Sequence, residues 1–324
     1  MNSLPMRFLA ALFATLPIAA TPALAQDWPS KAVRIIVPSA PGGGTDTYAR
    51  TMSTALADVL RQPFLVENRP GGNGNIGAEA VARASPDGYT ILFSASPALI
   101  MNPALYPKLS YSAERDLTPV AAGVVAPLMF CVHPSIPVKT LAELAAYGRR
   151  YPGKLTYGSA GQTSGTAMGV RLLEEASGAQ FTNIPYKGMG QAYQNLLSGE
   201  ISFMFAELLT VLPHIRVGKV IPLAISQRAP HLPDLPTVGE AGFPNSAVHA
   251  NFMVAVPTGT SVAIINRLNG EINRLMKTPD IAARLDKMAL VPQFGSPEEF
   301  ADRLKSERER WAGIIKRLNL KIDD

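Results

Sequence analysis

The stretch of this sequence best suited to chemistry is a glycine run, residues 38–46, in which Gly42, Gly43 and Gly44 are consecutive. A strand-like segment, 33–37, precedes the run, and a helix-like segment that begins near Thr45 follows it. A chain that turns from a strand through glycines into a helix leaves several backbone N–H groups unpaired, and the helix dipole adds partial positive charge at the same end. The run therefore predicts an anion-binding site.

Two later turns share this chemistry. Residues 71–74 and 159–165 each lie after a strand-like segment and before a helix-like one, which is where the ligands of open α/β sheets bind. A single turn of this kind could be an ordinary connection, whereas three of them favour a ligand site. The hydroxyl groups that could assist the N–H donors belong to Thr45, Ser94, Ser96, Ser159, Thr163 and Ser164.

Enzymatic uses of these turns fit the sequence less well. A P-loop needs a lysine directly after its last glycine, and no glycine run has one at that spacing; a dinucleotide fingerprint with its acidic residue cannot be aligned either. Residues 161–165 have the glycine spacing of a nucleophile elbow with Thr163 at the centre, but such a site needs a partner histidine. Because each of the four histidines is isolated, a hydrolase that uses Thr163 or Ser159 stays only as an alternative.

We therefore predict a protein that is not an enzyme and has no catalytic residue. No two histidines have the i, i+4 spacing of a metal site, and the chain has one cysteine. Neither a metal nor a cofactor is expected.

The first 25 residues have the pattern of a secretory signal. Arg7 supplies the positive region, residues 8–20 are mostly apolar, and small residues end at Ala25. The apolar run is shorter than the about 20 residues that a membrane helix needs. We expect cleavage after Ala25, which would leave an exported protein that begins at Gln26.

The order of elements predicts an α/β fold with two lobes. Removing 25 of 324 residues leaves 299, enough for two domains of about 150 residues. Strand-like and helix-like segments alternate from 33 to 93 and again from 155 to 225, the rhythm of βαβ units with a parallel sheet. The apolar segment 119–132 is expected to enter the second lobe, and 252–256 to return. Lobe 1 then comprises 26–124 with 251–324, and lobe 2 comprises 125–250.

Several other patterns are assigned to structure. The only cysteine, Cys131, lies in an apolar run and is expected in the core. Capping boxes at residues 140–143 and 296–299 each predict the start of a helix. On the final helix an apolar stripe packs against the domain, and it consists of Phe300, Leu304, Trp311, Ile315 and Leu318.

The charge of the chain favours a small anionic ligand over nucleic acid. The formal net charge is +5, or +4 once Arg7 has left with the signal, and the basic residues are scattered. A nucleic-acid-binding surface would need a basic run with interleaved aromatic residues. Nucleic acid is therefore not expected as a partner.

Taken together in this order, the motifs resemble the tripartite tricarboxylate transporter substrate-binding proteins, the TctC or Bug (Bordetella uptake gene) receptor family. The match covers nearly the whole mature chain. The segments that carry it are residues 28–31, 33–38, 41–46, 66–74, 86–90, 102–103, 157–161, 185–188, 212–215 and 235–238.

The resemblance implies a periplasmic receptor of the two-lobed, type II-like Venus flytrap fold, each lobe a mixed, mostly parallel sheet flanked by helices. Such a receptor closes on a small carboxylate in the cleft between the lobes and delivers it to the membrane subunits of the transporter. The expected ligand is a di- or tricarboxylate, an acidic amino acid or an aromatic acid. We expect a monomer, and a ligand-sensing receptor for a signalling system stays open as an alternative.

The resemblance also implies a set of ligand-binding residues, chiefly backbone N–H donors from the loops of the two lobes. Asp46 is interpreted as a loop or helix-cap residue, because a carboxylate aimed at an anion would repel it. The set is Pro41, Gly42, Gly43, Gly44, Thr45, Asp46, Ser94, Ser96, Ser159, Ala160, Gly161, Gln162, Thr163, Ser164, Tyr186, Lys187, Gly188 and Glu207.

The sequence departs from the family pattern in three places, one of which is a pair of residues. Many members have a histidine where this chain has Ala167, Asp-Asn where it has Ala206 and Glu207, and Trp where it has Asn251. Each change alters the polarity in or near the cleft. Our hypothesis is that these departures suit a ligand with an apolar or aromatic body and a carboxylate end.

Overall fold

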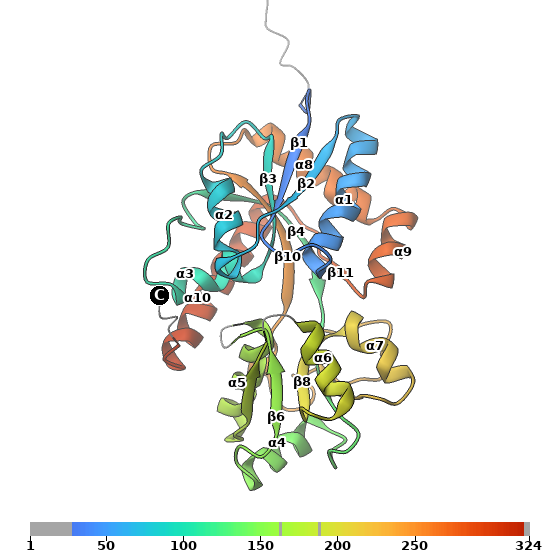
Figure 1. Cartoon of the computed structure of the whole chain (residues 1–324). Helices are drawn as coiled ribbons and strands as arrows, with labels where there is room; N and C mark the ends of the chain where they lie inside the picture. The colour runs from blue at the N-terminus through green and yellow to red at the C-terminus, as the bar shows by residue number, and fades with distance from the viewer. Residues whose placement is uncertain (1–27, 162–163, 187–188, 321–324) are drawn as a thin grey trace, which may run out of the picture.

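The structure is a computed structural model that describes residues 28–161, 164–186 and 189–320. These residues form two α/β lobes, one above the other in Figure 1, and extended segments of chain join them. The expected two-lobed α/β fold is confirmed.

Lobe 1 contains a six-stranded sheet in the order β11-β4-β10-β3-β1-β2. Its strands are β1 (Val33–Val37), β2 (Phe64–Asn68), β3 (Thr90–Ala95), β4 (Leu117–Ala126), β10 (Ala250–Pro257) and β11 (Val291–Pro292). One face packs against α1 (Gly44–Leu60), α8 (Val262–Met276) and α9 (Pro279–Lys287). The other face meets η1 (Gly72–Gly74), α2 (Asn75–Ala82), η2 (Pro97–Met101), α3 (Asn102–Leu105) and α10 (Pro297–Arg317) (Figure 1).

The side chains of β1 explain why both faces are covered. Val33, Ile35 and Val37 are buried in one cluster with residues of α1 and α8. Ile36 is buried in a different cluster, which contains residues of α2 and α10. Successive side chains of a strand point to opposite faces, so this apolar run buries both faces of the sheet at once.

Lobe 2 contains a five-stranded sheet in the order β7-β6-β8-β5-β9. Its strands are β5 (Leu128–Val132), β6 (Thr156–Ser159), β7 (Thr182–Pro185), β8 (Phe203–Glu207) and β9 (Ile221–Ile225). Phe130 and Phe205 pack on the side of α4 (Leu141–Arg150) and α5 (Gly165–Ser177). Met129 and Cys131 pack on the side of α6 (Met189–Ser198) and α7 (Leu208–Arg216). The turn η3 (Pro244–Ser246) follows β9.

The chain crosses between the lobes at two places, and the helix α10 contacts both lobes. Pro127 alone separates β4 from β5, and β10 leads back into the sheet of lobe 1. The helix α10 contacts both lobes, because Arg308 Nε donates to the Leu99 carbonyl at 2.8 Å and Arg317 forms an ion pair with Glu175 of α5.

Most expected elements occur close to their expected bounds. The strand 33–37 is found at those residues, and strands and helices alternate from β6 to β9 within the expected segment 155–225. Both capping boxes form, and Cys131 is buried. One detail of the sheets differs from the expectation. Among the described residues, antiparallel strand pairs number three against two parallel pairs in lobe 1, and two against two in lobe 2. The cause is that the strands at the crossings, β4, β5 and β10, pair antiparallel.

The predicted signal segment, residues 1–25, lies outside the described residues. Within the described ranges, no helix combines the length and the apolar character that a membrane crossing requires.

Candidate functional site

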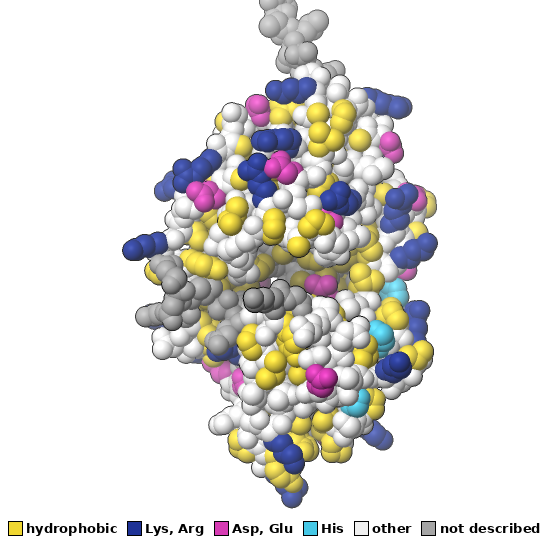
Figure 2. Space-filling view, viewed as in Figure 1, with side chains coloured by type: hydrophobic (Ala, Val, Ile, Leu, Met, Phe, Trp, Pro, Cys, Tyr) yellow, Lys and Arg dark blue, Asp and Glu magenta, His cyan; other side chains and the backbone are white. Residues whose placement is uncertain are grey.

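A cavity of about 320 Å³ lies between the two lobes. Figure 2 shows the molecule hollowed across its middle, with apolar side chains visible inside. A volume of this size is at the lower end of small-molecule sites, which span about 300–1,000 Å³. The cavity is lined by Ser39, Gly43, Gly44, Thr45, Asn73, Ala95, Ser96, Pro97, Met101, Leu128, Ala160, Ser164, Gly165, Thr166, Met189, Glu207, Val248, His249, Ala250, Phe252 and Trp311.

The N-terminus of α1 is the lobe 1 wall of this cavity. Gly43 is the N-cap residue and makes no side-chain cap, and Gly43, Gly44 and Thr45 all line the cavity. Among the described residues, the N–H groups of Gly44 and Thr45 have no hydrogen-bond partner. A Cβ built on Gly44 would lie 2.8 Å from Cζ of Phe252. Glycine is therefore required at position 44 by the close approach of a buried ring.

The side chain of Asp46 holds the glycine loop in place from behind. Its carboxylate accepts hydrogen bonds from the Gly42 N–H at 2.9 Å, from Asn68 Nδ2 at 2.8 Å and from Arg50 Nε at 3.0 Å. Burial raises the pKa of Asp46, but these hydrogen bonds lower it by more, so the net shift is downward. Asp46 does not line the cavity, and neither do Pro41 and Gly42.

The two serines at the end of β3 face different spaces. Ser96 lines the cavity, and its Oγ accepts from the Asn251 N–H at 3.0 Å. Ser94 donates to the Ala95 carbonyl and lines an adjoining cavity of about 280 Å³. The turn 71–74 takes part in both spaces, because Asn73 lines the first cavity while Gly71, Asn73 and Gly74 line the second.

The N-terminus of α5 is the lobe 2 wall. Ser164 is the N-cap residue, and its Oγ accepts from the Ala167 N–H at 3.3 Å and donates to the Gly161 carbonyl at 2.7 Å. The N–H groups of Gly165 and Thr166 have no hydrogen-bond partner in the described part of the chain. Two helix N-termini, one from each lobe, thus present free N–H donors to the same cavity, and this arrangement attracts an anion.

Glu207 brings a carboxylate into the cavity from lobe 2. It ends β8 and is the N-cap residue of α7, where it forms no side-chain cap. Its Oε2 atom lies 3.8 Å from the position that a Cβ on Gly44 would take, so the side chain reaches across to the N-terminus of α1. Burial raises the pKa of Glu207.

The remaining expected site residues lie outside the cavity lining or outside the described residues. Tyr186 accepts from Asn195 Nδ2 at 2.9 Å and packs against the core of lobe 2. Ser159 and Gly161 are absent from the lining. Gln162, Thr163, Lys187 and Gly188 are not among the described residues.

The surroundings of Ser159 do not support the hydrolase alternative, which would need a histidine hydrogen-bonded to the serine. The Ser159 Oγ donates to Asn183 Oδ1 at 2.8 Å, and none of the hydrogen bonds of the described residues joins it to a histidine. Thr163 lies outside the described residues. No group of three or more His, Cys, Asp or Glu side chains that could hold a metal ion occurs in the described ranges.

A comparison with protein families identifies the chain. Residues 48–320 match the family described as the tripartite tricarboxylate transporter family receptor, TctC. The chain belongs to this family.

Three proteins similar to this chain match it over most of their own length. Protein BugT of Bordetella pertussis is 34% identical over 306 residues, which are 94% of each chain. The R. palustris protein Rpa4515, solved with adipate, is 30% identical with a TM-score of 0.82 over 91% of this chain and 100% of its own. MatC from Rhodopseudomonas palustris, solved with malate, is 32% identical with a TM-score of 0.77 over 89% and 100%.

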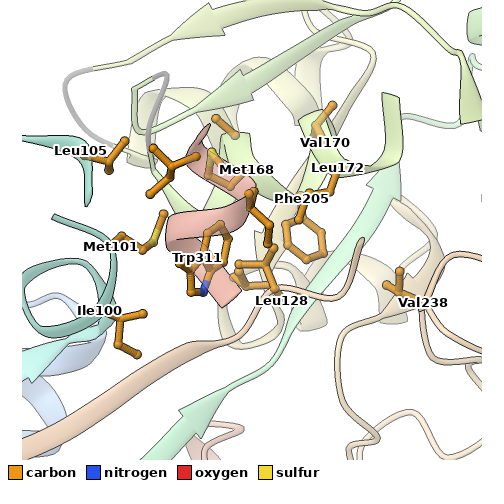
Figure 3. Close-up of a cluster of buried hydrophobic side chains, with 14 of the residues drawn as sticks. Ile100, Met101, Leu105, Leu128, Met168, Val170, Leu172, Phe205, Val238 and Trp311 are labelled. Carbon is orange, nitrogen blue, oxygen red and sulfur yellow. The ribbon is translucent and has the colours of Figure 1, made fainter. Parts of the chain in front are cut away.

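Several cavity residues of this TctC-family chain were not expected from the sequence. Trp311 was assigned to packing, and it is indeed buried, but Figure 3 shows it lying between Met101 and Leu128, all three of which line the cavity. Phe252 was expected only as part of a strand. The periodicity of an apolar stripe cannot distinguish a core position from a cavity wall, so no local signal marked these residues.

Besides Glu207, the other two family departures fall near the cavity. Ala167 is buried in the first turn of α5, where its N–H group donates to Ser164. Asn251 binds Ser96 through its N–H group and, at 3.3 Å, through its side-chain amide.

Proposed function

We propose that this TctC-family chain is a periplasmic receptor that captures a small carboxylate between its lobes and presents it to the membrane subunits of a tripartite tricarboxylate transporter. The proteins solved with adipate and with malate, which share 30% and 32% of their residues with this chain, support a carboxylate as the ligand class.

One observation supports the proposal most: N–H groups without a hydrogen-bond partner among the described residues, Gly44 and Thr45 of α1 and Gly165 and Thr166 of α5, line one cavity from opposite lobes. A carboxylate between them accepts hydrogen bonds from both helix ends, and each such charge-assisted bond contributes about 1.5–3 kcal/mol. Only a closed arrangement of the lobes makes both sets of bonds, so the ligand stabilises closure. The membrane subunits then recognise the closed form.

The proposal also includes the oligomeric state, the processing and the lobe boundaries of the receptor. The receptor acts as a monomer without catalysis, and its signal segment is removed after Ala25. Lobe 1 comprises 26–124 with 251–324, and lobe 2 comprises 125–250. The main ligand contacts are proposed at the two helix N-termini, from the cavity-lining residues Gly43, Gly44, Thr45, Ser164 and Gly165.

A thermal-shift panel of matched ligands tests the proposal. Di- and tricarboxylates, amino acids and aromatic acids are compared with their neutral amides, which keep the shape of each acid but lack its charge. A ligand at about 100 times its Kd adds about 2.7 kcal/mol of stability, so at least one acid should raise the Tm while its amide does not. Shifts only from phosphates or neutral sugars, or turnover of any substrate, contradict the proposal.

A further inference from the structure

Glu207 is the one acidic side chain among the described residues of the cavity lining, and it lies beside the expected anion site. Its Oε2 is 3.8 Å from the Cβ position of Gly44, the first residue of α1. A ligand whose carboxylate binds at the N-terminus of α1 therefore places its neighbouring atoms next to Glu207. A ligand atom at this position would be stabilised if it carried a group that binds a carboxylate.

The cavity itself supplies no such group from its described residues. None of the described lining residues is a lysine or arginine, and the Glu207 carboxylate has no hydrogen bond to any described residue. His249 is the remaining titratable side chain of the lining, and burial lowers its pKa, which favours the neutral imidazole. Burial raises the pKa of Glu207, because a carboxylate that is withdrawn from water without a partner is costly. A cationic group on the ligand would offset this cost, favour the ionised carboxylate and stabilise the complex.

The rest of the cavity is suited to an apolar body. Its walls away from the helix ends include Met101, Leu128, Val248, Phe252 and Trp311. Phe252 and Trp311 are 3% exposed, and Figure 3 shows the Trp311 ring between Met101 and Leu128. Aromatic and aliphatic walls of this kind favour a hydrocarbon or an aromatic ring.

We propose that Glu207 sets the specificity of the cleft by binding the ammonium group of an α-amino acid with an apolar or aromatic side chain. The inference rests on the proposed function, because it places the carboxylate of the amino acid at the N-termini of α1 and α5. In this arrangement the ligand carboxylate accepts hydrogen bonds from the N–H donors, and the ammonium group binds Glu207. The ligand side chain packs against the apolar residues around Trp311.

Four matched probes separate the roles of the two charges in isothermal titration of the mature chain. Phenylalanine, 3-phenyllactate and 3-phenylpropanoate differ only in the group on C2, which is ammonium, hydroxyl or hydrogen. Phenylalaninamide keeps the ammonium group and lacks the carboxylate. Since a hydrogen bond to a charged group is worth a factor of about 10 to 100 in Kd, phenylalanine should bind wild type at least about tenfold more tightly than 3-phenylpropanoate.

The variant Glu207→Gln should abolish this preference, so that phenylalanine and 3-phenylpropanoate bind it within about threefold of each other. Glu200→Gln is the matched control, because it removes the same charge from an exposed position of lobe 2 and should keep the wild-type ratio. A thermal melt of each variant verifies that it is folded.

The outcomes distinguish the two proposals. If 3-phenylpropanoate or any dicarboxylate binds wild type as tightly as phenylalanine, or if Glu207→Gln keeps the preference, the role of Glu207 is wrong while the carboxylate receptor stands. If phenylalaninamide binds as tightly as phenylalanine, or no acid binds at all, both proposals fall.

Discussion

Adding a single methyl group at Gly44 should block the ligand site from inside lobe 1. In Gly44→Ala the new Cβ would lie 2.8 Å from Cζ and 3.0 Å from Cε2 of Phe252, where apolar carbons normally keep about 3.5–4.0 Å. Phe252 is 3% exposed and stacks on Tyr48 with ring centroids 6.5 Å apart. The ring must therefore shift, and the N-terminus of α1 shifts with it or is covered.

The size of the effect follows from two terms. Overpacking a filled site costs about 1–3 kcal/mol, and replacing glycine by alanine within a helix returns up to about 1 kcal/mol. We expect a net loss of up to about 2 kcal/mol in the free energy of unfolding. The loss of one charge-assisted hydrogen bond to the ligand should raise the Kd about 10- to 100-fold.

The assay is titration calorimetry with the carboxylate that gives the largest thermal shift, together with a melt of each variant. The control is Gly270→Ala in α8, where a new Cβ meets nothing within 4 Å; its Kd should equal that of wild type. A folded Gly44→Ala protein with an unchanged Kd would refute the placement of the ligand at α1.

Three further variants test other parts of the site. Asp46→Asn should lower the free energy of unfolding by about 3 kcal/mol, because it removes the charge that binds Gly42 and two side chains. Since the folded pKa of Asp46 is lowered, this advantage of wild type is complete above the ordinary aspartate pKa of about 3.9 and is lost as the pH falls through the folded pKa; denaturant titrations from pH 7 to pH 2 measure it. Ser164→Ala removes the N-cap of α5 and should cost about 1 kcal/mol in chemical denaturation. Trp311→Ala should cost about 3–5 kcal/mol and weaken binding of ligands with aromatic bodies more than of short ones, as calorimetry would reveal.

Each of these expectations has its contrary result. An Asp46→Asn protein as stable as wild type at pH 7 would mean that the carboxylate does not hold the glycine loop. A Ser164→Ala protein as stable as wild type would mean that the Ser164 side chain does not stabilise the N-terminus of α5. Equal affinity losses for aromatic and short ligands in Trp311→Ala would place the ligand body away from this wall.

The sequence predicted the features that depend on local structure. The strand 33–37, the glycine run and α1 follow one another in the chain, so the proposed anion site at the N-terminus of α1 could be predicted from neighbouring residues alone. The same holds for the N-terminus of α5. The crossing near residues 119–132 could be inferred because an apolar, β-branched run linked two repeats of the βαβ rhythm.

The features that the sequence did not reveal depend on how distant segments meet. The hydrogen bond from Asn68 to Asp46 spans 22 positions, and Trp311 and Met101, which line the same cavity, are 210 positions apart. The approach of Glu207 to Gly44 depends on the relative placement of the two lobes, which no periodicity encodes. The share of antiparallel pairs was missed because it is set by the crossing strands and not by the βαβ units.

A crystal structure of the chain with the acid of highest affinity would show where the ligand carboxylate binds. The measured quantities are the distances from the carboxylate oxygens to the backbone nitrogens of the first turns of α1 and α5. If the carboxylate binds between the lobes as proposed, its oxygens accept hydrogen bonds of about 2.7–3.2 Å from at least one N–H group of each lobe. A carboxylate that contacts only one lobe, or that lies away from both helix ends, would contradict it.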